Sequence, residues 1–189
     1  MNRLSFYFFL SWALWFGSLG CSSSGNKKNI RDYYFPLKKM KTGLVYEYQP
    51  VSGDLSPVYW YYRTIVNPDG VFFIGTYYEY DLVPLQFVRE EMVGNGMLLE
   101  EIFLYNRDST GKQQPVPVEI LAGNVFPFEL SGPEGIFLYK IRWSPPDDPE
   151  ATTTLVKNRR YLGDTTIVFE GRPYEAVTFE VRELLEYDK

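Results

Sequence analysis

From Leu44 onward, apolar and polar residues follow the two-residue period of β-strands. Residues 44–49 alternate in this way, and residues 58–66 are rich in aromatic and β-branched side chains, which favour strands. The sequence Asn67-Pro68-Asp69-Gly70 is typical of a type I turn. We therefore predict that residues 71–80 return antiparallel to residues 58–66 and complete a first hairpin.

A second hairpin is predicted from residues 85–93 and 97–105, with Gly94-Asn95-Gly96 as its loop. A three-residue loop places Val93 opposite Met97, Arg89 opposite Glu101 and Glu90 opposite Glu100. Further strands are expected at 116–121, 136–143, 152–161, 165–169 and 174–185, separated by Gly- and Pro-rich turns, with 180–188 as the one candidate for a short helix. The pattern predicts an all-β fold of about 8–10 strands, a single antiparallel meander forming a curved sheet, a half-barrel or a lipocalin-like barrel.

The amino terminus differs from this pattern. Residues 4–19 carry no charge and are mostly apolar, Arg3 precedes them, and a polar run of small residues follows Cys21. The apolar run is short for a membrane span, which needs about 20 residues, but suits a secretory signal peptide.

The motif Ser18-Leu19-Gly20-Cys21 resembles the lipobox of bacterial lipoprotein precursors. The resemblance implies a signal peptide at 1–20, diacylation of Cys21, a flexible linker at 21–32 and a single β-rich domain at 33–189. Ser22 after the cysteine would imply sorting to the outer membrane by the enterobacterial rule. Ordinary signal-peptidase cleavage after Ser18-Leu19-Gly20 and a retained membrane anchor are the alternatives.

The start of the predicted domain, from Tyr33-Tyr34-Phe35-Pro36-Leu37 through a basic patch to residues 43–48, is similar to that of uncharacterised β-rich envelope lipoproteins of bacteria. This likeness implies a curved antiparallel sheet like those of lipoprotein carriers and lipocalins. It brings no functional residues with it.

The composition of the chain excludes several kinds of catalytic and metal-binding site. The 189 residues include no histidine and one cysteine, which excludes a Ser–His–Asp triad, histidine-ligated zinc and an intrachain disulfide. The 19 basic and 24 acidic residues give a net charge of −5, which argues against a nucleic-acid partner. We expect no cofactor and no metal, because the acidic run Asp147-Asp148-Pro149-Glu150 lacks the ligand spacing of a calcium loop.

Two clusters are candidate sites. The aromatic strands of the first hairpin place Tyr59, Tyr61, Tyr78 and Tyr80 as a candidate ligand-binding surface, although cross-strand packing also explains these rings. The glutamates at 90, 91, 100 and 101 lie on facing strands, where acid–base chemistry competes with a simple solvated surface.

The favoured interpretation is a non-enzymatic lipoprotein of the bacterial envelope. Its partners would be the membrane, through the lipid on Cys21, and a hydrophobic ligand or another envelope protein. The alternatives are a carboxylate-dependent hydrolase acting on glycans and a purely structural interaction module.

Overall fold

A computed structural model describes residues 28–50, 55–130 and 136–188. The candidate leader and Cys21 lie outside these residues. None of the helices in the described ranges is long and apolar enough to cross a membrane. The described chain is mostly β-strand, with two short 3₁₀ helices. In chain order the elements are β1 (Lys28–Asn29), η1 (Arg31–Tyr33), η2 (Leu37–Met40), β2 (Leu44–Tyr48), β3 (Val58–Asn67), β4 (Gly70–Tyr78), β5 (Pro84–Val93), β6 (Gly96–Arg107), β7 (Gln113–Pro117), β8 (Glu119–Gly123), β9 (Phe126–Pro127), β10 (Glu129–Leu130), β11 (Ile136–Trp143), β12 (Thr152–Phe169) and β13 (Arg172–Asp188).

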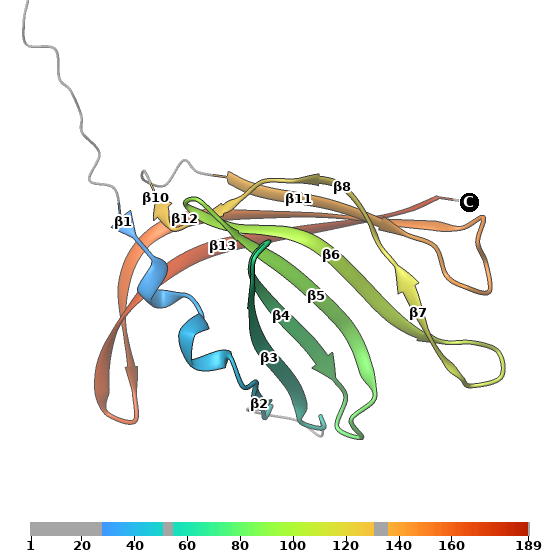
Figure 1. Cartoon of the computed structure of the whole chain (residues 1–189), viewed down its shortest axis with the longest axis horizontal. Helices are drawn as coiled ribbons and strands as arrows, with labels where there is room; N and C mark the ends of the chain where they lie inside the picture. Colours follow the sequence, from blue (N-terminus) through green and yellow to red (C-terminus); the bar gives the residue numbers. More distant parts are fainter. Residues whose placement is uncertain (1–27, 51–54, 131–135, 189) are drawn as a thin grey trace, which may run out of the picture.

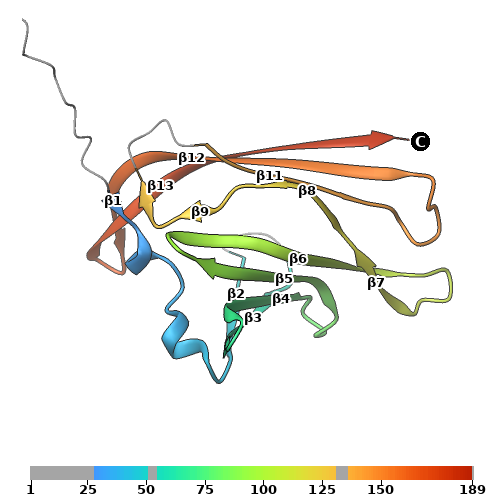
Figure 2. The same ribbon diagram turned by 45° about the horizontal axis from the view of Figure 1, so that its top comes forward.

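The strands form antiparallel sheets that are not closed into a barrel, which confirms the predicted all-β fold (Figure 1). The larger sheet has the order β2-β3-β4-β5-β6-β7, with β9 pairing β6 as a seventh strand. The second has the order β13-β12-β11-β8, and β1 pairs with β10. Figure 2 shows the two larger sheets one above the other, with the N-terminal segment passing along one end.

The first hairpin follows the prediction. Strand β3 pairs with β4 from Tyr59–Tyr78 to Asn67–Gly70. Asn67 Oδ1 accepts hydrogen bonds from the backbone N–H groups of Asp69 and Gly70, each at 3.1 Å. An Asx side chain that satisfies turn donors in this way explains why Asn-Pro-Asp-Gly ends one strand and starts the next.

The second hairpin corrects the predicted loop. Val93 pairs with Gly96, so the loop has two residues instead of three. A β-bulge between Arg89 and Glu90 then takes up one extra residue, Glu100, and restores the predicted Arg89–Glu101 pair. Glu90 consequently faces Leu99 rather than Glu100.

Two predictions for the C-terminal region are wrong. Residues 152–161 and 165–169 are one strand, because Gly163 pairs with Thr178 of β13 instead of forming a turn, and a β-bulge at Leu162 takes up the extra residue. The strand predicted at 174–185 is confirmed as part of β13, whereas the candidate helix at 180–188 is the second half of this strand and pairs with the first half of β12. A neighbouring strand that supplies a partner for every residue outweighs the weak helical pattern of this segment.

The predicted strand at 116–121 is divided in two. Strand β7 pairs with β6 in the larger sheet, whereas β8 pairs with β11 in the other. The chain therefore changes sheets at Val118, whose backbone N–H donates to Ile102 O at 3.3 Å.

The core consists of two clusters of buried side chains. One joins Met40 of η2 to Tyr62, Phe73, Met97 and Phe128. The other contains Ile30, Phe126, Leu130 and Tyr161. Because Ile30 is buried and β1 is paired, the folded region includes residues 28–32, which the sequence assigned to a linker.

Candidate ligand-binding groove

The segment from Arg31 to Lys41 lies on the inner face of the larger sheet, and its local structure separates apolar from charged side chains. A 3₁₀ helix has three residues per turn, so Leu37 and Met40 of η2 lie on the same side. Met40 is fully buried, while Lys38 and Lys39 between them are exposed. The pattern Leu-Lys-Lys-Met-Lys thus fixes this segment to the sheet and directs its lysines away from the core.

Aromatic contacts hold the same segment in place. The ring of Phe35 packs against Tyr62 and Phe73, with centroid distances of 4.5 and 4.8 Å. The Tyr34 hydroxyl donates a 2.6 Å hydrogen bond to a carboxylate oxygen of Glu90 on β5. Burial, followed by the nearby charge of Glu90, raises the pKa of Tyr34 well above its usual range. Tyr34 therefore stays a neutral donor, and the bond connects the N-terminal segment to the sheet.

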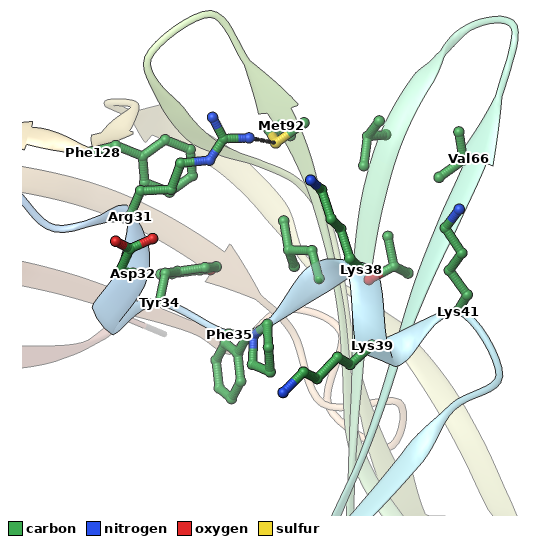
Figure 3. A pocket seen from close by; sticks show the side chains of 14 residues that line it. Arg31, Asp32, Tyr34, Phe35, Lys38, Lys39, Lys41, Val66, Met92 and Phe128 are labelled. Atoms are coloured by element: carbon green, nitrogen blue, oxygen red, sulfur yellow. Dashed lines mark hydrogen bonds between the residues drawn. The ribbon is translucent and has the colours of Figure 1, made fainter.

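A groove of about 580 Å³ lies between this segment and the end of the β3–β4 hairpin. Its apolar floor comes from β3, β4 and β5 and its wall from the N-terminal segment (Figure 3). The volume falls within the range of about 300–1,000 Å³ that is usual for small-molecule sites. The lining residues are Arg31, Asp32, Tyr34, Phe35, Pro36, Leu37, Lys38, Lys39, Lys41, Thr64, Val66, Val71, Met92 and Phe128.

The charged residues of the groove are mostly basic. Among the described residues that line it, Arg31, Lys38, Lys39 and Lys41 oppose a single carboxylate, Asp32, which gives a local charge of +3 (four cations and one anion). Within residues 28–50, 55–130 and 136–188, none of the four cations forms an ion pair.

Arg31 contacts apolar groups instead of a carboxylate. Its Nη2 atom lies 3.8 Å from the Met92 sulfur, and its guanidinium carbon lies 5.6 Å from the centre of the Phe128 ring. Figure 3 shows the side chains of Arg31 and Lys38 directed to either side of Met92, at the same opening. The guanidinium is thus placed over the apolar lining with its hydrogen-bonding capacity largely unused.

Thr64 is a second unusual feature of the groove. Its side chain lines the floor, yet its hydroxyl oxygen is buried and has no hydrogen-bond partner among the described residues. A buried hydroxyl without a partner costs about 1–3 kcal/mol. Such groups in native structures commonly mark a position where a water molecule or a ligand supplies the missing bond.

A smaller, polar cavity of about 270 Å³ lies near β1. There Asp164 accepts hydrogen bonds from Lys28 Nζ at 2.9 Å and from the Tyr161 hydroxyl at 2.6 Å. These bonds, led by that from Tyr161, lower the pKa of Asp164. The cavity therefore contains an internally satisfied network that fixes the start of the folded chain to β12.

The tyrosines predicted from the sequence lie elsewhere. Tyr59 pairs directly with Tyr78, and strand alternation places Tyr61 on the same outer face of the larger sheet. Tyr80 follows β4 and is exposed. None of these four residues lines the groove. Their assignment as a ligand-binding surface stays a prediction.

Three of the four glutamates predicted as a second cluster, Glu90, Glu100 and Glu101, have protein partners. Glu90 accepts the bond from Tyr34, and Arg89 lies 3.2 Å from a carboxylate oxygen of Glu100 and 3.5 Å from one of Glu101. Among the described residues, no group of three or more Asp, Glu, Cys or His side chains is placed to hold a metal ion.

The sequence interpretation missed the groove residues Lys38, Lys39, Lys41 and Thr64. The spacing of Leu37 and Met40 with lysines between them was a usable signal, because it is the period of a 3₁₀ helix. Nothing local marks Thr64, whose isolation depends on the fold. Comparisons of the chain with protein families, curated proteins and solved structures find no match, so the site is interpreted from its own geometry.

Proposed function

We propose that this protein is a non-enzymatic, lipid-anchored binding protein of the bacterial envelope that holds an apolar ligand in the N-terminal groove. The observation that carries the binding role is the groove itself, an apolar floor containing a buried hydroxyl without a partner. Apolar surface supplies most of the affinity for such a ligand, and a few polar groups fix its orientation.

The anchor is inferred from the sequence. An apolar leader followed by Gly20-Cys21 supports acylation of the cysteine, and two or more acyl chains hold a protein firmly on a bilayer. Labelled palmitate should enter the wild-type protein and not the Cys21→Ala variant. Equal labelling of the two proteins, or of neither, would contradict the anchor. Separation of inner from outer membranes on a density gradient then tests the expected outer-membrane location.

The binding role is tested with a neutral, environment-sensitive dye, N-phenyl-1-naphthylamine, added to the purified full chain. We expect its fluorescence to rise on binding and this rise to be lost in Val66→Trp, which places an indole in the groove. Val45→Trp is the matched control, because Val45 is an exposed valine on the neighbouring strand that does not line the groove. If both tryptophan variants bind the dye like the wild type, the groove is not the binding site.

A further inference from the structure

The charges at the rim of the groove narrow the chemical class of ligand that it would bind. We propose that the groove binds an amphiphile with an anionic head group, such as a phosphate or carboxylate, whose chain lies on the apolar floor. The proposal rests on the proposed function, since it names the chemical class of ligand for the same site.

The first argument is the contrast between the groove and the rest of the chain. From Arg31 onward, the part of the chain that includes the whole groove, the sequence contains 16 basic and 24 acidic residues, a net charge of −8. Even so, four cations with only one carboxylate gather at the groove. A cluster of this sign on an acidic protein attracts anions at the groove and repels them elsewhere, which steers an anionic ligand toward this site.

The second argument is that, within the described residues, none of these cations is in an ion pair with a carboxylate. Many charged side chains elsewhere in this fold are paired; Arg142 with Glu119 and Lys157 with Glu183, for example, each have an N–O distance of 2.6 Å. At the groove, η2 turns Lys38 and Lys39 outward, and Arg31 rests against Met92 and Phe128. The arrangement leaves several N–H donors available to the oxygens of one anion.

The third argument is the chemistry of the cations and of the surface beneath them. A guanidinium can donate two parallel hydrogen bonds to a phosphate or carboxylate, and lysines add charge without fixed geometry. Apolar side chains around the bound anion lower the local dielectric and strengthen these contacts. The side chains of Val66, Val71 and Met92 lie in the same groove and would cover a hydrocarbon chain attached to that anion.

The test compares three competitors for the dye on the unmodified full chain, with dodecyl phosphate kept below its critical micelle concentration and dodecanol below its solubility limit. These are dodecyl phosphate, dodecanol, which has the same chain without the charge, and inorganic phosphate, which has the charge without the chain. We expect dodecyl phosphate to displace the dye at a much lower concentration than dodecanol, and inorganic phosphate to displace none.

Charge-removing variants add a second, independent measurement. Lys38→Gln and Lys41→Gln should each weaken binding of dodecyl phosphate about fivefold, equivalent to about 1 kcal/mol per charge near an anionic group. Their affinity for dodecanol should not change. Lys112→Gln is the control, because Lys112 lies in the β6–β7 loop away from the groove. Unfolding midpoints equal to wild type would show that the variants fold.

The outcomes of these binding measurements distinguish a failure of the head-group inference from a failure of the proposed function. If dodecanol competes as well as dodecyl phosphate and the lysine variants change nothing, the head-group inference is wrong while the apolar site stands. If inorganic phosphate displaces the dye at the same concentration as dodecyl phosphate, the cations form an anion site that needs no hydrocarbon chain, and the proposal of an amphiphilic ligand is wrong. If the dye itself does not bind the wild type, the proposed function fails as well.

Discussion

Truncating Met40 to alanine tests whether the N-terminal segment is fixed by the core as the structure indicates. Met40 has 0% of its surface exposed and is one of the three largest fully buried side chains. It packs in the cluster formed with Tyr62, Phe73, Met97 and Phe128. It also belongs to η2, so its loss affects both the core and the wall of the groove.

The size of the expected destabilisation depends on how far the neighbouring side chains can move into the space that the Met40 side chain leaves. Buried Met→Ala substitutions cost about 2–5 kcal/mol, and the cost rises with the volume of the cavity left behind. The rings of Phe35, Tyr62 and Phe73 pack against one another with centroids 4.5–5.3 Å apart and resist movement into that cavity. The η2 backbone is free to shift inward, because it is a single short turn rather than a paired strand. We therefore expect a loss of about 3 kcal/mol, which is a large part of a typical stability of 5–15 kcal/mol.

Denaturant unfolding measures this loss. The midpoint should fall with little change in the slope, since the same surface is exposed on unfolding. Lys39→Ala is the matched control: the residue is adjacent and exposed, and its alanine variant should stay within about 0.5 kcal/mol of wild type. Equal stabilities for the two variants would refute the idea that Met40 anchors the segment.

Three further predictions concern stability. Gly96→Ala should destabilise the protein by about 1–3 kcal/mol, because the added Cβ would clash with the carbonyl oxygen of Phe126, which belongs to the paired strand β9. An unfolding midpoint of the variant equal to that of the wild type would contradict this contact. Thr64→Val should raise the stability of the ligand-free protein by about 1 kcal/mol, because it removes a buried hydroxyl that has no hydrogen-bond partner. A loss of stability in denaturant unfolding would show that the hydroxyl does have a partner. Burial, together with a hydrogen bond to Tyr48, raises the pKa of Tyr62, whereas an unfolded tyrosine titrates near pH 10. The contribution of Tyr62 to stability should therefore be constant below about pH 10 and fall above it, where only the unfolded state releases the proton. The stability of Tyr62→Phe should fall less steeply above pH 10, and an unchanged profile there would count against the buried tyrosine.

The parts of the fold that the sequence predicts are those with local causes. The first hairpin follows from its turn residues, because Asn67 satisfies the turn donors through its own side chain. Gly163 shows the limit of local patterns. A glycine next to an aspartate is typical of a turn, yet Gly163 pairs with Thr178 of β13 and the chain continues through a bulge at Leu162. The change of sheet at Val118 likewise depends on distant partners, since β6 and β11 lie on either side of it.

The groove was harder to predict than the strands. Alternation divides the aromatic residues of β3 into two faces but does not say which face another segment covers. The N-terminal segment packs against Tyr62 on one face, so the tyrosines at 59, 61 and 78 remain on the other. The segment itself shows no strand pattern and was assigned partly to a linker. Its docking depends on side chains that are close only in the folded protein, such as Tyr34 and Glu90.

The position of the groove in the chain connects ligand binding with the proposed anchor. Six residues lie between Cys21 and Lys28, and the seven Cα–Cα steps from one to the other span at most about 25 Å when fully extended. The groove begins at Arg31, within the same N-terminal segment. An acyl group on Cys21 would therefore keep the four cations near a bilayer surface, where anionic head groups attract them and repel the acidic remainder of the chain. A tether this short raises the local concentration of membrane amphiphiles at the groove, so even modest intrinsic affinity would fill it. A site on the outer tyrosine face would lack both the cations and this short connection.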